Sequence, residues 1–384
     1  MSLLAAETSR QRIDRPAAIA RSLLPLAGIV IGALLIHGAG ASLGQYPSRV
    51  MLDCGVAIIA AVSLTIVNGF TGQFSIGHAA FIAIGGYTAG FCTYYFALSR
   101  GIDPGGVNAS LLGGPQWVMA AACILAGIVA AGIGWIVGLP SLRLRGDYLA
   151  IVTLGFGEIV RVLIQQTAPQ IDSAAEFRQT GWIAALLPPA VGGSLGLRDT
   201  PKTTNLFWLF IAVGICLLFA FRLKYSSLGR ALISIREDEI AAEAMGVNVT
   251  KLKVRAFVFA AFFAGVAGAL CAHIPGVPMN PADAGFQRSF DIVMMVVLGG
   301  LGSISGATVA AILITLITAF TLALAEYDLL QYRMPVFAIL LILMMIFRPR
   351  GIFGLNEIWD WLPGFRRKRN LLENQRGFDV EEKA

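Results

Sequence analysis

The sequence predicts an all-α protein that crosses a membrane about ten times, and three observations support this prediction. Of the 384 residues, 57% are hydrophobic and only 14% are charged, and the mean hydropathy of +0.74 is too high for an ordinary soluble domain. Apolar runs long enough to cross a bilayer, each of roughly 20 residues, recur along the chain. Between two of these runs lies a short, charged and amphipathic stretch at 225–255.

The apolar runs predict the spans one by one. Their lengths suit helices, which satisfy their backbone hydrogen bonds internally, and not the shorter strands of a membrane barrel. In chain order the runs cover 22–36, 50–67, 76–98, 117–139, 148–164, 206–223, 256–272, 292–301, 307–325 and 334–347, of which 292–301 is short.

The basic residues predict the orientation. Of the 29 Lys and Arg residues, 21 fall on one side of the predicted spans and seven on the other, while Arg161 lies inside a span. The side rich in Lys and Arg is expected to be cytoplasmic. Both termini then lie in the cytoplasm, which requires an even number of spans.

The predicted organisation is one membrane domain at 22–354, between a cytoplasmic lead-in at 1–21 and a charged cytoplasmic tail at 355–384. The first apolar run starts after several Arg residues and lacks an Ala-x-Ala site, so we expect it to be retained as a span. The net charge of +6 follows from the loop bias and does not indicate a nucleic-acid partner. The five Cys residues lie in apolar runs without metal-ligand spacing, so no metal site is expected.

The cytoplasmic loop at 224–253 is expected to hold an amphipathic helix. Ser226 or Ser227 can cap its start and Gly246 its end. Apolar residues keep roughly helical spacing at Leu228, Leu232, Ile235 and Ile240. Acidic residues between 237 and 243 disfavour an anionic lipid surface, so a protein partner is favoured over a connector that rests on lipid.

Two Gly- and Ser-rich junctions interrupt the apolar pattern at 68–81 and 298–306, both on the predicted cytoplasmic side. Irregular backbone at membrane depth persists only where it is packed in protein or lines a cavity. We expect either helix starts that line a path through the membrane or close helix packing, and both interpretations stay open. The candidate pathway residues are Gly72, Ser75, Gly77, His78, Gly300, Gly302 and Ser303.

Other polar residues do not predict an enzyme. Ser75 and His78 have Gly-x-x-Ser-x-Gly spacing, which is not that of a serine hydrolase, and no carboxylate lies nearby in the sequence to orient the His. Glu158 and Arg161 are three residues apart inside a span and are candidates for an intramembrane ion pair. The chain has no Walker A pattern, so an ATPase would have to be a separate chain.

Four segments together resemble a known family. They are NGFTGQFSIGHAAFIAIGGYTA at 68–89, LRGDYLAIVTLGFGEIVR at 144–161, GRALISIREDEIAAEAMGVN at 229–248 and MVVLGGLGSISG at 295–306, and a final RPRGIFG at 348–354 also fits. In this order they resemble the membrane permeases of the branched-chain amino-acid ABC importers, the LivM type.

The resemblance implies an ABC importer permease fold in the bacterial inner membrane and a set of partners. These are a second permease of related fold, two cytoplasmic ATP-binding subunits that hold the ATP, and a periplasmic substrate-binding protein; no cofactor is expected on this chain. It also implies that the stretch 229–246 is the coupling segment that contacts an ATPase. The coupling candidates are Gly229, Arg230, Arg236, Glu237, Asp238, Glu239, Glu243 and Gly246.

Alternative functions stay open at this point. The substrate is a branched-chain or related amino acid, or else urea or a short-chain amide, because importers of those compounds have similar permeases. A stand-alone secondary transporter would need an ion-coupled site at the bilayer midplane, and few charges lie inside the spans. An intramembrane enzyme would need a complete catalytic set, which the sequence does not contain.

Overall fold

The computed structural model describes residues 15–323, apart from 108–110, 112, 143, 145, 187, 188 and 277. Beyond 323 it describes 335, 339, 342, 346–348, 351–354, 357 and 358. The described part is helical, and its extended pairings are two isolated bridges, Ala168 with Ala190 and Leu197 with Met279. The all-α prediction is therefore confirmed for these residues.

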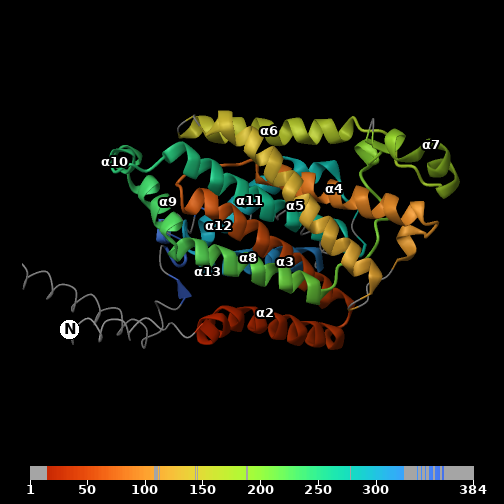
Figure 1. The fold of residues 1–384 in the computed structure, drawn as a ribbon, viewed down its shortest axis with the longest axis horizontal. Helices are drawn as coiled ribbons and strands as arrows, with labels where there is room; N and C mark the ends of the chain where they lie inside the picture. Colours follow the sequence, from red (N-terminus) through yellow and green to blue (C-terminus); the bar gives the residue numbers. More distant parts are fainter. Residues whose placement is uncertain are drawn as a thin grey trace, which may run out of the picture.

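The long helices run in chain order through a bundle (Figure 1). They are α2 (Arg15–Leu43), α3 (Gln45–Leu64), α4 (His78–Ser99), α5 (Gly114–Ser141), α6 (Asp147–Gln165), α8 (Leu206–Tyr225), α11 (Val249–Ala272) and α13 (Ile304–Ala323). The shorter ones are α7 (Ala174–Leu186), α9 (Ser227–Glu237), α10 (Glu239–Ala244) and α12 (Phe286–Gly299). Single turns lie at η3 (Pro104–Gly106), η4 (Gly193–Leu195) and η5 (Pro281–Ala284), and η2 (Thr65–Gly69) continues α3 as a π-helix.

Seven helices of the described part are long and apolar enough to cross a membrane. They are Gln45–Gly69, His78–Ser99, Gly114–Ser141, Tyr148–Gln165, Leu206–Tyr225, Val249–Ala272 and Ile304–Thr321, and each overlaps a predicted span. Three predicted spans differ: 22–36 lies in α2, whose apolar part Pro25–Gly40 is shorter, 292–301 overlaps α12, which has 14 residues, and 334–347 lies mostly outside the described residues. The number ten stays a prediction.

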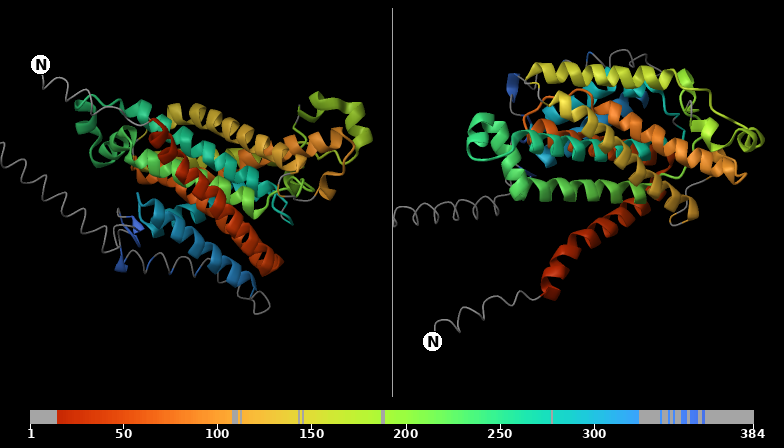
Figure 2. Two further views of the ribbon diagram at one scale, coloured as in Figure 1. Left: turned by 60° about the horizontal axis from the view of Figure 1, so that its bottom comes forward. Right: turned by 45° about the horizontal axis from the view of Figure 1, so that its top comes forward.

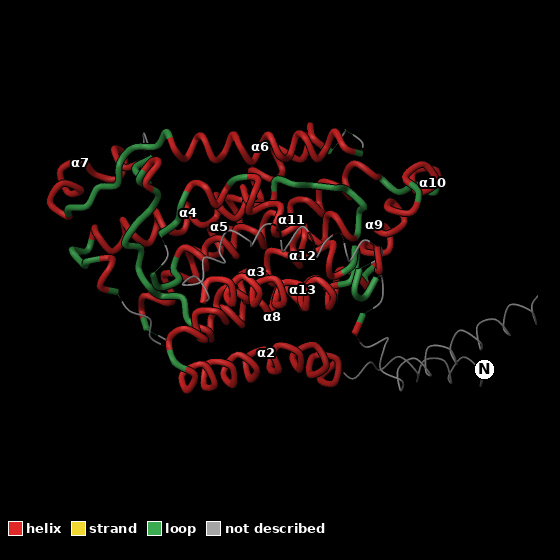
Figure 3. Tube along the Cα trace, turned by 180° about the vertical axis from the view of Figure 1, so that it is seen from behind, coloured by secondary structure: helices red, strands yellow, loops and turns green. Residues whose placement is uncertain are grey.

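Helix α11 lies at the centre of the bundle, against α3, α4 and α5 (Figure 3). Small residues allow this close approach. A Cβ atom at Gly268 would lie 1.8 Å from the carbonyl oxygen of Ile82, and one at Gly85 would lie 2.2 Å from that of Gly265. Because lipid gives little hydrophobic driving force between helices, such backbone contact is a main source of helix association in membranes.

The two ends of the bundle differ. Helices α9 and α10 extend beyond the bundle at one end, and α7 lies at the opposite end (Figure 1). Helix α2 lies on the outside of the bundle (Figure 2) and contacts α8. A Cβ atom at Gly214 of α8 would meet Ile29 of α2 at 2.4 Å, so the glycine allows this contact. We refer below to the α10 end and the α7 end.

Candidate functional site

The segment between α8 and α11 folds as two helices, where the sequence predicted one. Ser226 caps α9 and accepts a hydrogen bond from the Gly229 amide at 3.1 Å, as expected. The helix then breaks at Asp238, because this side chain accepts hydrogen bonds from the amides of Ile240 and Ala241, at 2.9 and 3.0 Å, and caps α10 instead. The prediction of a single helix is wrong for this reason.

The break changes the direction in which Ile240 points. The helical spacing places Ile240 with Leu232 and Ile235 on an inward face, and those two are buried. Ile240 instead is 72% exposed, and Met245, just after α10, is 85% exposed. Exposed Glu243 lies between them in the sequence. The tip of the α9–α10 unit is therefore an apolar surface with acidic neighbours, at the α10 end of the bundle.

A small core holds α10 in place. Ile235 of α9, Ala242 of α10 and Val249 of α11 form one buried cluster. The Glu239 carboxylate forms an ion pair with Lys253 of α11 at 2.8 Å, and the Lys253 side chain is only 7% exposed. The α9–α10 unit is thus attached firmly to α11.

The remaining coupling candidates have structural positions in the same unit. Gly229 has no room for a side chain, since a Cβ atom would lie 2.0 Å from the Leu223 carbonyl oxygen. Arg230 is exposed and its guanidinium lies 3.4 Å from the Tyr225 carbonyl oxygen. Gly246 follows α10 with a φ of 83° and donates its amide hydrogen to Glu243 at 2.9 Å, so its predicted role at the helix end is confirmed.

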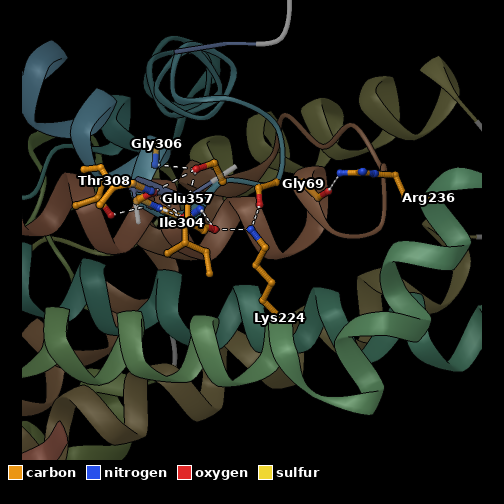
Figure 4. Close-up of polar contacts among 11 residues, drawn as sticks. Gly69, Lys224, Arg236, Ile304, Gly306, Thr308 and Glu357 are labelled. Carbon is orange, nitrogen blue, oxygen red and sulfur yellow. Dashed lines mark hydrogen bonds and ion pairs between the residues drawn. The ribbon is translucent and has the colours of Figure 1, made fainter. Parts of the chain in front are cut away.

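Arg236 joins α9 to the first Gly-rich junction. One guanidinium nitrogen donates to the Gly69 carbonyl oxygen at 2.9 Å (Figure 4), and another pairs with Glu237 at 2.6 Å. The stem of Arg236 also covers Gly72, where a Cβ atom would lie 2.7 Å from Arg236 Cγ. Gly72 has a φ of 69°, which favours glycine. The end of α9 is therefore fixed to the point where α3 ends.

Lys224, near the end of α8, and Glu357 connect the start of the α9–α10 unit to the second junction. Lys224 Nζ donates to the Gly302 carbonyl oxygen at 2.8 Å and forms an ion pair with Glu357 (Figure 4). The Glu357 carboxylate accepts hydrogen bonds from the backbone amides of Ile304 and Ser305, at 3.1 and 2.9 Å, and from the Ser305 hydroxyl at 2.6 Å. Glu357 thus supplies the anion at the N-terminus of α13 and the counter-ion of Lys224.

The two junctions touch each other. A Cβ atom at Gly69 would lie 2.7 Å from the Gly302 backbone nitrogen. Gly300 and Gly302 have φ values of 111° and 101°, and Ser303 accepts a hydrogen bond from the Gly306 amide at 3.1 Å, which caps the start of α13. The turn between α12 and α13 therefore packs directly on the break between α3 and α4.

The first junction is closely packed. Ser75 and His78 are 2% and 3% exposed, and His78 Nε2 shares a hydrogen bond of 2.8 Å with the Ser63 hydroxyl. A Cβ atom at Gly77 would lie 2.3 Å from the Thr153 carbonyl oxygen. The Ile76 amide donates to the Thr153 hydroxyl at 3.1 Å. These contacts favour packing at this helix start, while the role of these residues in a pathway stays a prediction.

Glu158 and Arg161 lie on α6 and form an ion pair of 2.6 Å. The second Glu158 oxygen accepts a hydrogen bond from the Phe286 amide at 3.1 Å. Phe286 is the first residue of α12, so the pair connects α6 to the start of this short helix.

A cavity of about 440 Å³ is lined by α3, α12 and α13 toward the ends of these helices that lie away from the two Gly-rich junctions. Five charged residues line it: Arg49, Asp53, Asp283, Arg288 and Asp291. Its walls are apolar and come from α3, α4, α12 and α13, through Val56, Ile82, Ile292 and Ile314 among others. None of the candidate pathway residues lines this cavity.

Asp53 and Asp291 stand out in the sequence as ionisable residues within or at the edges of predicted spans, where such groups usually face the protein interior. Sequence analysis did not identify the other cavity charges, Arg49, Asp283 and Arg288, nor Lys224 or Glu357. The four residues Arg49, Asp53, Arg288 and Asp291 lie at or near span ends, where charges are common. Lys224 and Glu357 are 133 residues apart, and no local pattern connects them. A signal was present in the i, i+4 spacing of Arg49 and Asp53 near the start of a predicted span.

The comparisons with known proteins agree with this architecture. The family model for the branched-chain amino acid transport system permease component matches residues 46–347. The high-affinity branched-chain amino acid transport system permease protein LivM of Salmonella typhimurium strain LT2 is 33% identical over 323 residues, which cover 79% of this chain and 68% of LivM. LivH of Escherichia coli strain K12 is 28% identical, over 82% of this chain and 96% of LivH. No solved structure matches the chain.

The family match extends over all seven described candidate spans, from α3 to α13, and includes the α9–α10 unit. It ends before Glu357, so this residue lies outside the matched region. The chain is a multi-pass membrane protein that belongs to the branched-chain amino acid transport system permease family.

Proposed function

We propose that this chain is the membrane-spanning subunit of an ATP-driven importer for branched-chain amino acids and forms half of the translocation pathway. The observation that supports this most directly is the α9–α10 unit. Its exposed Ile240 and Met245 form an apolar tip at the end of the bundle, and exposed apolar surface away from lipid is typical of a protein interface. A cytoplasmic ATPase is the partner that fits this position.

The proposed complex contains this chain, a second permease of related fold, two cytoplasmic ATP-binding subunits and a periplasmic substrate-binding protein. The similarity of the chain to both LivM and LivH supports a pair of related permeases. The complex would lie in the bacterial inner membrane, with the α10 end and both termini in the cytoplasm. The chain itself would have no catalytic residue and no cofactor, because ATP binds to the partner subunits.

Coupling would run through two fixed points, one on α9 and one at the end of α8 that leads into it. Movement of the ATPases displaces the tip at Ile240 and Met245. Helix α9 transmits this displacement through Arg236 to Gly69, and the adjoining end of α8 transmits it through Lys224 to Gly302. These points are the ends of α3 and of the turn between α12 and α13. The same three helices line the charged cavity at their other ends, so a shift at the α10 end changes the shape of the cavity.

The proposed substrate follows from the relatives, which are named as branched-chain amino acid permeases. An importer of urea or a short-chain amide is the alternative. Competition decides between them: in liposomes that contain the complex and ATP, excess valine should suppress leucine uptake, and urea or acetamide should not. Suppression by urea or acetamide alone would favour the alternative.

Association with the ATPase tests the coupling surface. We expect the double variant Ile240→Ser with Met245→Ser to insert normally but to lose most of the copurifying ATPase, because interface anchors typically contribute 2 kcal/mol or more, about thirtyfold in affinity. The matched control is Leu195→Ser, since Leu195 is 64% exposed at the α7 end. It should retain the ATPase.

Full ATPase recovery with the double variant would contradict the proposed coupling surface. Substrate transport by the lone purified chain, without ATP and driven by an ion gradient, would favour a secondary transporter instead. Turnover of a substrate into a chemically different product by the lone chain would favour an intramembrane enzyme.

A further inference from the structure

Two of the helices that form the charged cavity, α3 and α12, carry ionic groups into the apolar part of the protein. Asp53 lies eight residues beyond Gln45, the first residue of α3, and therefore about 12 Å along the helix at about 1.5 Å per residue. Asp291, on α12, is 6% exposed. Ionisable groups at such positions are costly in a membrane and usually mark a path for substrate or ions.

The charges do not form a closed set of ion pairs. Arg49 donates to the Pro275 carbonyl oxygen at 2.6 Å and contacts the Asp53 carboxylate at the longer distance of 3.3 Å. The Asp53 side chain is 45% exposed in spite of this contact. Arg288 lines the same cavity as Asp53. Within the described residues, Arg288 forms no ion pair or side-chain hydrogen bond. The cavity thus offers a guanidinium and a partly exposed carboxylate at once.

The cavity also has the size and the walls of a small-molecule site. Its volume of about 440 Å³ lies in the ordinary range for such sites, which are apolar with a few convergent polar groups. Val56, Ile82, Ile292 and Ile314 provide aliphatic surface beside the charges. A molecule that fits must therefore combine a positive end, a negative end and a compact apolar part.

We propose that the charged cavity binds a zwitterionic aliphatic amino acid, with its carboxylate at Arg288, its ammonium group at Asp53 and its side chain against the aliphatic wall. A planar guanidinium binds a carboxylate through two parallel hydrogen bonds. An ammonium donor suits the free oxygen lone pairs of Asp53. The identity of the substrate rests on the proposed function, but the location of the site and its need for both charged ends do not.

The site is expected to be weak. Asp53 is partly exposed and already contacts Arg49, so solvent and an internal partner compete with the ligand. Weak binding suits a permease, because the substrate must leave the cavity again during each cycle. We therefore expect leucine to bind in the millimolar range.

The test measures binding to the purified complex, without ATP and without the substrate-binding protein. Radiolabelled leucine should bind saturably to the wild-type complex. Arg288→Gln should weaken binding about ten- to hundredfold, the usual effect of a lost hydrogen bond to a charged group, and Asp53→Asn should weaken it similarly. The matched control is Arg198→Gln, which removes an exposed Arg outside this cavity and should bind leucine like the wild type.

Two analogues test the roles of the charged ends. Isoamylamine lacks the carboxylate and isocaproate lacks the ammonium group, so neither should compete with leucine in the wild type. In Arg288→Gln the preference for leucine over isoamylamine should disappear, and in Asp53→Asn the preference over isocaproate should disappear. A folding defect lowers the fraction of active protein but does not produce these opposite changes in selectivity.

A second measurement reports directly on occupancy of the cavity. Thr315 of α13 lines the same cavity, and Thr315→Cys in a background without other Cys residues can be labelled with a small methanethiosulfonate. Leucine should slow this labelling, and isocaproate should not. Absence of both saturable binding and protection in the wild type overturns the proposal, as does wild-type binding by Arg288→Gln and Asp53→Asn.

Failure of this site and failure of the proposed function are distinguishable. If the complex imports leucine with ATP while both cavity variants bind and import it like the wild type, the cavity is not the site and the function stands. If leucine binds in the cavity as expected but ATP drives no uptake, the site stands and the proposed function is wrong.

Discussion

The ion pair of Lys224 with Glu357 should contribute strongly to the stability of the α10 end. The side chains are 12% and 2% exposed. The change Glu357→Gln keeps the shape but removes the charge and one acceptor oxygen. It leaves the Lys224 ammonium group without its counter-ion, while the hydrogen bond to the Gly302 carbonyl oxygen remains. It also weakens the capping of α13 at the Ile304 and Ser305 amides.

The expected magnitude follows from these contacts. Removal of one partner from a buried ion pair costs about 3–5 kcal/mol, because the other charge is left uncompensated. Lys224 keeps one hydrogen bond, so we expect a value near the lower limit, about 3 kcal/mol. For a chain of this size this corresponds to a decrease in Tm of roughly 5–10 °C.

The assay is thermal unfolding of the purified chain in detergent, followed by intrinsic fluorescence, with Glu243→Gln as the matched control. Glu243 is exposed, so its change should alter stability by no more than about 0.5 kcal/mol. The double variant Lys224→Met with Glu357→Gln should be less destabilised than the sum of its single variants. Equal Tm values for Glu357→Gln, Glu243→Gln and the wild type would refute the reasoning.

Three further predictions concern packing, topology and pH. Gly69→Ala should lower the Tm because a Cβ atom would lie 2.7 Å from backbone, whereas Gly132→Ala, with nothing within 4 Å, should not; equal losses would contradict this. In a background without Cys, Ser173→Cys should be labelled from the periplasm and Ser234→Cys from the cytoplasm. The reverse pattern would show that the protein has the opposite orientation in the membrane. Burial lowers the pKa of His273 from its ordinary 6.5 to about 4. Between pH 4 and 6.5 the unfolded chain therefore binds more protons than the folded chain, so stability should fall as the pH decreases through this range. His273→Gln should flatten the resulting dependence of Tm on pH.

Much of the fold could be predicted because membrane helices follow local rules. Long apolar runs form spans wherever they occur, so seven predicted spans correspond to described helices. The ends of the α9–α10 unit were also predictable, since Ser226 and Gly246 act on backbone groups within a few residues. The two Gly-rich junctions were expected on the same side, and Gly69 and Gly302 lie in contact.

The candidate site was predictable only in part. The stretch 229–246 was predicted as the coupling segment from the resemblance, and that role stays a prediction. Its division at Asp238 was missed because Asp238 can be read either as an exposed residue within one helix or as the cap of a second one. Periodicity assigned Ile240 to the inward face, whereas the second helix starts in a new direction and exposes it.

The sequence by itself determined which segments are helical and apolar enough to span a membrane, and where the chain breaks between them, because those properties depend on neighbouring residues. Only the tertiary structure decided which distant charges meet. Helix packing brings Lys224 to Glu357 and places Arg49 and Arg288 around one cavity. Such pairings depend on the relative rotation and depth of several helices, and those are set by contacts such as the one between Gly268 and the Ile82 backbone, which no local pattern specifies.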